Sequence, residues 1–416
     1  MKYNTIIIGG GLSGLVAGIS LADRGESVAI ISSGQSALHF SSGSFGLLGR
    51  TPDGVDVDRP LDAIAKLPAS HPYNVIGADR VAGLASRVPE LFAKAGITLK
   101  GSATENHLRL TPFGKCCRSW LTMTDFITCD MSVDKAGVSG SLRRLAVVNL
   151  RGFLDFYPGY LVDGLSAHGI ECTVDTVTTD ELERLRHSST EMRPSTIARH
   201  LVGAELERFA GELNRVSGDV DAVLIPAVVG FDSEAPLAKL REMVKKPVYC
   251  VATTPMSVCG LRAQMMLRDC FERLGGIYLL GDNVVNGNFE ADGRLASIRT
   301  VNMGDDLLEA DNFILATGGI FSRGIVADPQ HIYEPLFGLD VDAPADREQW
   351  YSRDFFARQP YMTCGVTTDS MFRPSRQGVT VSNLRAVGAV LSGCDPLAEE
   401  SGAGVAILTA LAATGM

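Results

Sequence analysis

One stretch decides the fold of this chain: Tyr3-Asn4-Thr5-Ile6-Ile7-Ile8-Gly9-Gly10-Gly11-Leu12-Ser13-Gly14. Its first half ends in three β-branched residues, a pattern that predicts a short buried strand. The glycines then follow the spacing G-x-G-x-x-G, and the apolar, alanine-rich run from Leu15 to Arg24 predicts a helix. A strand, a glycine turn and a helix in this order indicate the first unit of a Rossmann-like α/β fold.

Each glycine of this turn has a physical role. Gly9 permits the tight turn, Gly11 lets the backbone approach a phosphate, and Gly14 lets the helix pack close to the strand. Leu12 and Ser13 open the helix, whose free N–H groups and partial positive charge attract an anion. We therefore predict that these five residues bind the phosphate of a nucleotide cofactor. The alternative is a glycine-rich turn without a ligand.

The acid that usually holds a ribose is missing. In a dinucleotide-binding fold, Asp or Glu follows the second strand and binds the ribose 2′-OH. Here the strand predicted at 28–31 is followed by Ser32-Ser33-Gly34, and the nearest acids, Asp23 and Glu26, precede it. We expect Ser32 to contact the cofactor. The residues that bind the phosphate are all present, whereas the acid that would bind an adenosine ribose is missing.

Composition limits the class of protein. The 416 residues suffice for two domains or one large domain, and 45% of them are hydrophobic. A net charge of −10 argues against a nucleic-acid partner and against electrostatic binding to anionic lipid. No apolar run reaches the roughly 18 residues of a membrane span, and we expect no signal peptide. The sequence thus predicts a cytoplasmic protein.

Cysteine spacing gives no sign of a metal centre. The nine cysteines form no C-x-x-C pair, so reduced thiols in a cytosolic compartment are the expectation. Zinc or iron–sulfur ligation by this chain alone is therefore not expected.

A loop of small hydroxyl residues and glycines follows the second predicted strand, at 34–46. Its backbone and Oγ groups can donate to a phosphate or to ring carbonyls, and we predict cofactor contacts from Ser41, Ser42 and Gly43. The alternative is a solvated Ser/Gly loop.

The middle of the chain shows a second alternation of strands and helices. Apolar runs predict strands at 145–148, 170–177, 222–225 and 248–252 and helices at 160–168, 195–215, 235–244 and 258–274. Because this part has no glycine fingerprint, we interpret it as an inserted parallel α/β domain.

The last third returns to the first sheet. Short strands at 277–280, 295–301 and 307–308 suggest a meander that ends in Phe313-Ile314-Leu315-Ala316-Thr317-Gly318-Gly319. Such a buried strand ending in glycines is expected to rejoin the sheet near the cofactor. We predict that Thr317, Gly318 and the later Gly388 contact it.

A closing helix is predicted from Gly402 to Ala413, with Ser401 as its N-cap. Its start, Gly402 and Ala403, could face the N1–C2=O edge of a flavin and stabilise the negative charge of the reduced ring. The alternative is an ordinary core helix.

These elements in this order resemble the two-dinucleotide-binding-domain flavoproteins, particularly the fumarate reductase and succinate dehydrogenase flavoprotein group. A closer resemblance, over nearly the whole chain, is to the B subunits of bacterial anaerobic glycerol-3-phosphate dehydrogenases. It rests on the strings at 34–44, 255–262, 365–369 with 373–375, and 388–393.

The resemblance implies an α/β, Rossmann-like flavin-binding fold with an inserted α/β domain. We expect the flavin-binding domain at 1–55, 276–325 and 365–416, the inserted domain at 56–275, and a connecting or cap segment at 326–364. It further implies oxidation of sn-glycerol 3-phosphate to dihydroxyacetone phosphate. Electrons would pass to quinone, with fumarate or nitrate as terminal acceptor.

The implied partners are an FAD-containing catalytic chain, known in this family as the A subunit, and an iron–sulfur chain, the C subunit. The latter would attach this chain to the cytoplasmic face of the inner membrane.

The family implies FMN as the cofactor. The absence of an acid after the second predicted strand, at Ser32-Ser33, and the presence of Ala389 agree with FMN. FAD is the alternative. His39 stands in a different register from the covalent flavin histidine of fumarate reductases, so a non-covalent flavin is expected. Arg323 stands where a small residue is expected.

Catalytic residues cannot be identified from spacing. Arg262, Arg373 and Arg376 are weak candidates for binding the substrate phosphate, because arginine offers a bidentate fork, although most arginines simply face solvent. Two other functions remain open: a cofactor-free chain that docks the catalytic and iron–sulfur partners together, and a stand-alone flavin reductase of unsaturated acids.

Overall fold

The computed structural model describes residues 2–129, 142–188 and 192–415. The chain divides into two compact units, each with its own core. The first unit comprises Met1–Ala37, Phe45–Leu91 and Leu267–Met416, and the second comprises Leu38–Ser44 and Phe92–Met266.

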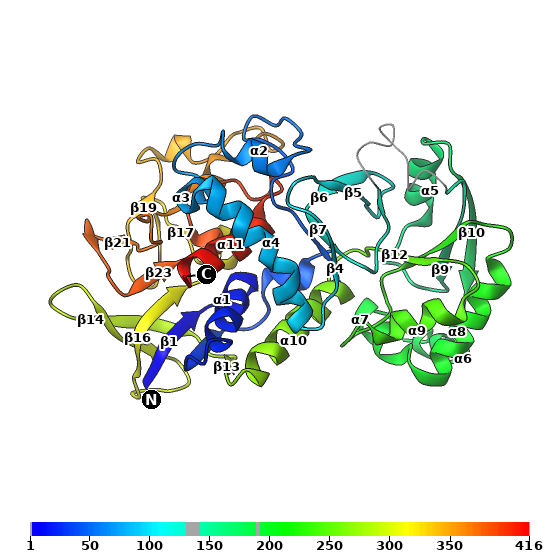
Figure 1. The fold of residues 1–416 in the computed structure, drawn as a ribbon, viewed down its shortest axis with the longest axis horizontal. Helices are drawn as coiled ribbons and strands as arrows, with labels where there is room; N and C mark the ends of the chain where they lie inside the picture. Colours follow the sequence, from blue (N-terminus) through cyan, green and yellow to red (C-terminus); the bar gives the residue numbers. More distant parts are fainter. Residues whose placement is uncertain (1, 130–141, 189–191, 416) are drawn as a thin grey trace. The chain divides into compact units, whose positions relative to one another are not determined.

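A seven-stranded sheet, counted over the described residues, forms the centre of the first unit (Figure 1). Its order is β13-β2-β1-β16-β15-β14, with β23 paired to β16. The pairs among β13, β2, β1, β16 and β23 are parallel, and β14 and β15 are antiparallel to their neighbours. The strands are β1 Lys2–Ile8, β2 Val28–Ser32, β13 Ile277–Leu280, β14 Val284–Phe289, β15 Leu295–Thr300, β16 Leu308–Leu315 and β23 Leu384–Ala386.

The register of this sheet brings three strand ends together. Ile8 of β1 pairs with Ile31 of β2 on one side and with Leu315 of β16 on the other. The prediction that the chain rejoins the first sheet through 313–319 is therefore confirmed. In open parallel sheets, ligands bind at the carboxyl ends of the strands, which here meet at one edge.

Two apolar helices pack against each other in this unit. In α1 (Leu12–Ala22), every residue from Ser13 to Ala22 is buried, and α11 (Gly402–Ala413) is buried from Gly404 to Ala412. A helix that is apolar on all sides needs neighbours all round. Contacts between α1 and α11, and between α11 and α3, provide part of this packing (Figure 1).

The remaining elements of the first unit are short. Its further helices are α2 Pro60–Ile64, α3 Pro72–Ile76 and the start of α4 Ala78–Lys94. Small strand pairs and 3₁₀ turns make up most of 317–400: β17 Val326–Ala327, β18 Ile332–Tyr333, β19 Val341–Asp342, β20 Gly365–Val366, β21 Ser375–Arg376, β22 Val379–Thr380 and the 3₁₀ turns Ile320–Ser322, Arg347–Gln349, Pro360–Thr363 and Gly388–Val390.

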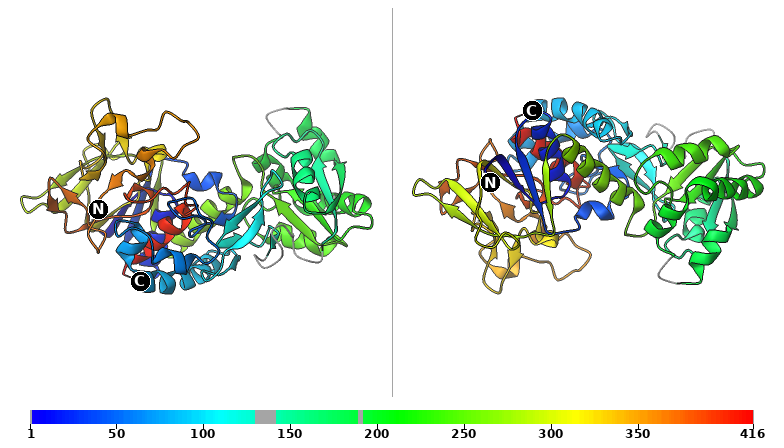
Figure 2. Two further views of the ribbon diagram at one scale, coloured as in Figure 1. Left: turned by 90° about the horizontal axis from the view of Figure 1, so that it is seen from above. Right: turned by 90° about the horizontal axis from the view of Figure 1, so that it is seen from below.

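The second unit is built on a four-stranded parallel sheet of order β10-β9-β11-β12, so the predicted inserted parallel α/β fold is confirmed (Figure 2). Its strands are β9 Arg144–Leu150, β10 Glu171–Val177, β11 Ala222–Pro226 and β12 Val248–Val251. Its helices are α5 Pro158–Ser166, α6 Asp180–Arg186, α7 Pro194–His200, α8 Gly203–Val216, α9 Ala235–Met243 and the start of α10 Val258–Arg273. Short antiparallel strands precede them: β3 Ser44–Phe45, β4 Leu99–Gly101, β5 His107–Leu110, β6 Cys116–Ser119, β7 Leu121–Met123 and β8 Thr128–Cys129.

Three sequence expectations about secondary structure were wrong. The helix predicted at 195–215 is two helices, because Leu201 leaves the helical region (ψ 66°) and Gly203 has a positive φ of 55°. The short strand predicted at 307–308 is the start of the long strand β16, and β14 was not predicted.

The boundaries of the units differ from the domains expected from the sequence. α2, α3 and most of α4 belong to the first unit, whereas the expected division placed everything from 56 to 275 in the insert. The segment 326–364, expected to be a separate cap, also belongs to the first unit.

A buried ion pair stabilises the second unit. Arg262 and Asp125 are 0% and 1% exposed, and the Arg262 guanidinium donates to the Asp125 carboxylate and, at 3.1 Å, to the carbonyl of Gly230. Removing one partner of a buried pair leaves an uncompensated charge in the interior, which costs about 3 kcal/mol or more.

We predict that Asp125→Asn lowers the free energy of unfolding by about 3 kcal/mol, measured by urea denaturation followed by far-UV circular dichroism. The matched control is Asp219→Asn, which breaks the exposed pair between Asp219 and Arg144 and should leave the transition unchanged. Equal transitions for Asp125→Asn and the wild type would contradict the prediction.

Candidate functional site

The glycine turn between β1 and α1 is tight for two of its glycines and open for the third. Gly9 has a φ of +116°, and a Cβ on Gly14 would lie 1.9 Å from the Gly9 carbonyl oxygen. A Cβ on Gly11 would meet only the Ser36 Cβ, at 3.5 Å. The chain itself therefore requires Gly9 and Gly14 to be glycine, whereas the space beside Gly11 is free for a ligand.

A tyrosine that sequence reasoning missed fixes this turn. The Tyr278 hydroxyl on β13 donates to the Gly10 carbonyl oxygen at 3.1 Å. Tyr278 comes from far along the chain, and only the parallel pairing of β13 with β2 brings it here.

The start of α1 offers backbone donors to an anion. Leu12, Ser13 and Gly14 form the first turn, whose N–H groups have no acceptor inside the helix. No acidic side chain lies in this turn. Its donors and the helix dipole therefore favour a bound phosphate, as the sequence predicted.

The ends of β2 and β16 contribute polar groups to the same edge of the sheet. The Thr317 hydroxyl oxygen is buried without a hydrogen-bond partner in the described part of the chain, and Gly318 has a φ of +79°. By contrast, the Ser32 hydroxyl donates to the Gly34 carbonyl oxygen at 3.2 Å. A buried hydroxyl without a partner is costly, so Thr317 fits a site that a ligand completes.

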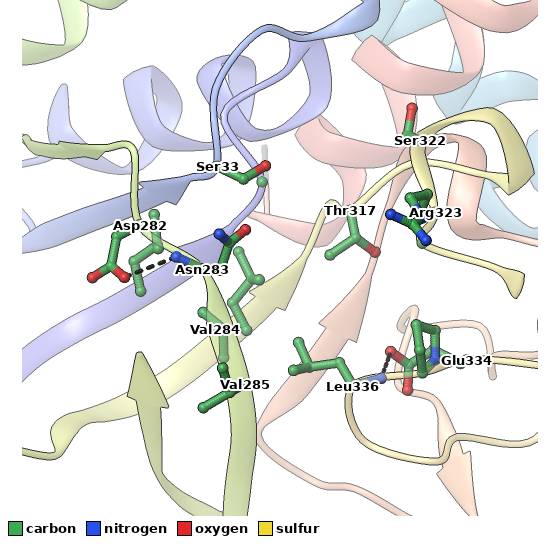
Figure 3. A pocket seen from close by; sticks show the side chains of 15 residues that line it. Ser33, Asp282, Asn283, Val284, Val285, Thr317, Ser322, Arg323, Glu334 and Leu336 are labelled. Atoms are coloured by element: carbon green, nitrogen blue, oxygen red, sulfur yellow. Dashed lines mark hydrogen bonds between the residues drawn. The ribbon is translucent and has the colours of Figure 1, made fainter. Parts of the chain in front are cut away.

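A cavity of about 440 Å³ lies beside Gly9 at this edge (Figure 3). Ser33, Asn283 and Val284 line one side of it, and Thr317 and Arg323 line the other. No sequence pattern pointed to Asn283 or Val284, because they follow a strand that is distant from Gly9 along the chain.

The charged residues of this cavity differ in what they can do. Arg323, which has a positive φ of 63°, is exposed and can approach an anion. The Glu334 carboxylate already has hydrogen-bond partners in its own loop, because it accepts the N–H groups of Leu336 and Phe337 at 2.9 and 2.8 Å. Burial raises the pKa of Glu334, although these backbone bonds oppose the shift.

Gly388 and the start of α11 lie close to α1. Gly388 has a φ of +76°, and a Cβ there would lie 2.2 Å from the Ser13 hydroxyl oxygen. Gly402 and Ala403 open α11 and are half-buried, and their N–H groups have no acceptor inside the helix. Of the predicted cofactor residues, the first unit thus brings together those of α1, the ends of β2 and β16, Gly388 and α11.

The prediction that Ser401 caps α11 was right about its position and wrong about its hydrogen bond. Ser401 occupies the N-cap position, but its side chain makes no capping hydrogen bond. Its hydroxyl donates instead to the Glu399 carboxylate at 3.2 Å.

The predicted residues Ser41, Ser42 and Gly43 belong to the second unit. There Arg109, which is 2% exposed, donates to the hydroxyl oxygens of Ser42 and Ser44 at 2.7 and 2.8 Å. Arg109 makes no ion pair within the described residues, and burial lowers its pKa. Because the two hydroxyl oxygens accept from Arg109, their own protons remain available to other acceptors.

The three candidate arginines differ in availability. Arg262 is fully buried and paired with Asp125, so it does not reach a solvent-borne substrate. Arg376 donates to the Phe337 carbonyl oxygen at 2.9 Å. Arg373 is one-third exposed and pairs with Asp369 at 2.7 Å.

A fourth arginine, Arg385 on β23, escaped the sequence analysis. It is half-buried, its side chain makes no hydrogen bond in the described part of the chain, and it precedes Gly388 by three residues. Burial and the neighbouring charge of Arg373 lower its pKa.

Metal-binding and membrane-spanning features are both lacking in the described ranges. Over residues 2–129, 142–188 and 192–415, no group of three or more His, Cys, Asp or Glu side chains is placed to bind a metal ion. Among the helices of the same ranges, none combines the length and the apolar character needed to cross a bilayer.

The chain is similar in sequence to a known domain family and to named bacterial proteins. The sequence profile of the FAD binding domain matches residues 4–405. The chain is 42% identical to the B subunit of the anaerobic glycerol-3-phosphate dehydrogenase of Yersinia enterocolitica, with 99% of this chain and 97% of the relative covered. It is 39% identical to the protein of the same name from Pectobacterium atrosepticum, with the same coverage.

One solved structure that matches this chain is the 3-ketosteroid-delta4-(5alpha)-dehydrogenase of Rhodococcus jostii RHA1. It is 11% identical to this chain, with 100% of this chain and 97% of that structure covered, and the TM-score is 0.35.

We predict that Gly11→Val abolishes flavin binding while the chain stays folded, because the added side chain would occupy the space that a phosphate needs. Purified protein should be colourless, with an unchanged circular dichroism spectrum. Gly14→Val is the contrasting variant: its Cβ would collide with the Gly9 carbonyl, so the fold itself should be damaged. A yellow Gly11→Val protein with full occupancy would show that the flavin binds elsewhere.

Proposed function

Because this chain belongs to the family of anaerobic glycerol-3-phosphate dehydrogenase B subunits, we propose that it carries a flavin in the oxidation of sn-glycerol 3-phosphate to dihydroxyacetone phosphate. The observation that supports the flavin most directly is the edge of the first sheet, where Gly11 leaves open space and the Thr317 hydroxyl lacks a partner. In this reaction the substrate loses a hydride from C2 and a proton from its hydroxyl group. A bound flavin would supply the acceptor for the hydride and could release the electrons singly.

The phosphate of the flavin would lie at the start of α1, near Gly11, and its pyrimidine edge at the start of α11, near Gly402 and Ala403. At that position the N–H groups of α11 would stabilise the charge of the reduced ring. We propose that the binding site in this unit is completed by Gly9, Leu12, Ser13, Gly14, Ser32, Thr317, Gly318 and Gly388. The cofactor contacts expected from Ser41, Ser42 and Gly43 stay a prediction.

Two observations bear on the form of the flavin. The absence of an acid after β2, at Ser32-Ser33, supports FMN, which has no adenosine ribose to bind. The cavity of about 440 Å³ beside Gly9 supports FAD, because an adenosine could occupy it next to Arg323.

We predict FMN from the missing acid. Heat release of the cofactor, followed by chromatography and mass measurement, should give one FMN per chain. A stoichiometric FAD peak would show that an adenosine is bound although no acid follows β2.

For the substrate phosphate, we propose Arg373 together with Arg385. Arg373 keeps one face towards its Asp369 partner, and the Arg385 side chain makes no hydrogen bond within the described residues. Two guanidinium groups that raise each other's energy would be stabilised by a dianionic phosphate between them.

Arg385→Gln should raise KM for glycerol 3-phosphate about tenfold in the assembled enzyme, with a smaller change in kcat. The control is Arg299→Gln, which removes an exposed cation paired with Asp305. An unchanged KM for Arg385→Gln would exclude this residue from the substrate site.

The relatives are named as B subunits, which indicates a complex of several chains. We propose a catalytic A subunit and an iron–sulfur C subunit as partners, with electrons passing through the iron–sulfur partner to quinone at the cytoplasmic face of the inner membrane.

Phe355 and Phe356 are 85% and 93% exposed. They lie in a segment whose Trp350, Tyr351 and Tyr361 line an apolar cavity of about 420 Å³. Exposed aromatic side chains beside a cavity are typical of protein–protein contacts.

The double variant Phe355→Ser/Phe356→Ser should therefore lose co-purification with its partner subunits by a factor of ten or more, while its own flavin content stays the same. Val301→Ser removes an apolar side chain that is 58% exposed on another segment and serves as the control. Full recovery of the complex by the double variant would exclude this surface.

Expression with and without the partner genes distinguishes the remaining functions. We expect flavin absorption in the chain alone and dye reduction by glycerol 3-phosphate only in the complex. A colourless chain that still assembles would support a cofactor-free docking role. Strong reduction of an unsaturated acid by the single chain would support a stand-alone reductase.

A further inference from the structure

A cluster of buried polar side chains lies beside the start of α11 and is not explained by cofactor binding alone. His71, at the start of α3, is 0% exposed, and Glu399 and Ser401, before α11, are 2% and 0% exposed. Figure 1 shows α3 next to α11, in agreement with the contacts between these two helices. Buried ionisable groups are costly, so the protonation of this cluster needs an explanation.

The hydrogen bonds of His71 determine its tautomer. Its Nδ1 accepts the backbone N–H of Tyr73 at 3.1 Å, so Nδ1 carries no proton. The proton of the neutral ring is then on Nε2, which donates to the Glu399 carboxylate at 3.1 Å. His71 can satisfy both partners while uncharged.

Glu399 accepts hydrogen bonds from three neutral donors. One oxygen accepts from the His71 Nε2–H and from the Ser401 hydroxyl at 3.2 Å, and the other accepts from the Asp395 backbone N–H at 3.1 Å. Hydrogen bonds to the charged form favour an ionised carboxylate. Within the described residues, the one side chain that could pair with Glu399 as a cation is His71. Because its Nδ1 accepts the Tyr73 N–H, the His71 ring is neutral.

Two neighbours of Glu399, Tyr73 and Cys394, have raised pKa values. Burial, Cys394 and Glu399 together raise the pKa of Tyr73, and burial, Glu399 and Asp395 raise the pKa of Cys394. Both groups therefore stay neutral. Asp395 uses its own carboxylate to accept the N–H groups of Leu397 and Ala398, as a turn residue does.

The backbone around Glu399 holds the charge in place. The Glu399 carbonyl oxygen accepts the N–H groups of Gly49 and Arg50 at 2.9 and 3.1 Å. The Tyr73 hydroxyl donates to the Leu47 carbonyl oxygen at 2.6 Å, and the Gly404 N–H donates to that of Gly46 at 2.8 Å. The carboxylate thus cannot move away from the positive end of α11.

We propose that the Glu399 carboxylate, which accepts hydrogen bonds from His71 and Ser401, is a positioning residue that lowers the reduction potential of the flavin. The inference rests on the proposed place of the flavin at the start of α11. Reduction adds negative charge to the N1–C2=O edge of the ring, and the helix end stabilises that charge. Glu399 is a second anion at the same helix end, so it offsets part of this stabilisation and disfavours the reduced form.

The test is Glu399→Gln in the full flavin-loaded chain. The amide keeps the shape of the side chain and can accept from His71 and Ser401, but it removes the charge. The equilibrium between oxidised and reduced flavin should shift about tenfold towards the reduced form, which is about 30 mV for a two-electron couple. The measurement is equilibration with a dye of known potential, followed by absorption.

Glu400→Gln is the matched control. Glu400 is the next residue, but its side chain is 30% exposed and lies 3.9 Å from Arg50, so solvent and a cation already screen its charge. We expect a clearly smaller shift than for Glu399→Gln. Equal shifts in the two variants would mean that any nearby carboxylate has the same effect, and the special role of Glu399 would be wrong.

A second variant decides the question if Glu399→Gln does not fold. In His71→Asn, the amide oxygen can still accept the Tyr73 N–H, but the donor to Glu399 is lost. The carboxylate then loses one of its three donors and is held less firmly at the helix end, so the flavin equilibrium should shift towards the reduced form. The same flavin potential in wild type and His71→Asn would overturn the inference.

These outcomes are separable from failure of the proposed function. A wild-type chain that binds no flavin contradicts the proposed function. A chain that binds flavin with the same potential in wild type and Glu399→Gln contradicts only the role of Glu399.

Discussion

The strand β1 hydrogen-bonds to β2 on one side and to β16 on the other, and this double pairing places the whole site. Ile8 is in register with Ile31 and with Leu315, so three strands end at the same level. The turn at Gly9 begins directly after Ile8, and Thr317 follows Leu315 by two residues. Ile6, Ile7 and Ile8 are all buried, so this end of β1 is covered on both faces, as is usual for a strand inside a parallel sheet.

Electrostatics at this edge depend on helix ends more than on side chains. The first turns of α1 and α11 have no acidic residues, and the N–H groups of Gly402 and Ala403 have no acceptor inside α11. The acids near this edge accept hydrogen bonds from the chain itself: Asp282 and Glu334 from backbone N–H groups, and Glu399 from His71, Ser401 and the Asp395 N–H. The chain therefore offers helix ends to an anion and fixes these carboxylates by hydrogen bonds.

Local patterns predicted the parts of the fold that depend on nearby residues. The turn at Gly9–Gly14 follows from spacing, and the inserted parallel unit follows from alternating apolar runs. β14 was missed because its sequence, Val284–Phe289, contains Gly287 and two asparagines and buries none of its residues fully. The Ser401 cap failed because the Gly404 N–H, which a capping oxygen would accept, donates to the Gly46 carbonyl oxygen instead.

Contacts between distant segments could not be predicted from the sequence. His71 and Glu399 are separated by 328 positions, and neither has a local pattern that marks it as buried. Tyr278 reads as an ordinary strand residue until β13 is placed beside β2. The site residues that were identified came from motifs, and those that were missed come from the topology of the sheet.

The three motif glycines show how a structure separates the needs of the fold from those of a ligand. A side chain on Gly14 would strike the Gly9 carbonyl at 1.9 Å, and Gly9 itself has a φ that side chains disfavour. Both residues would have to be glycine even in a protein without a cofactor. Gly11 has an ordinary φ and only one neighbour, at 3.5 Å, so packing alone would accept a larger residue there. Glycine is also a favoured N-cap residue, and at this N-cap it leaves open space that a group outside the chain can approach as closely as a side chain would.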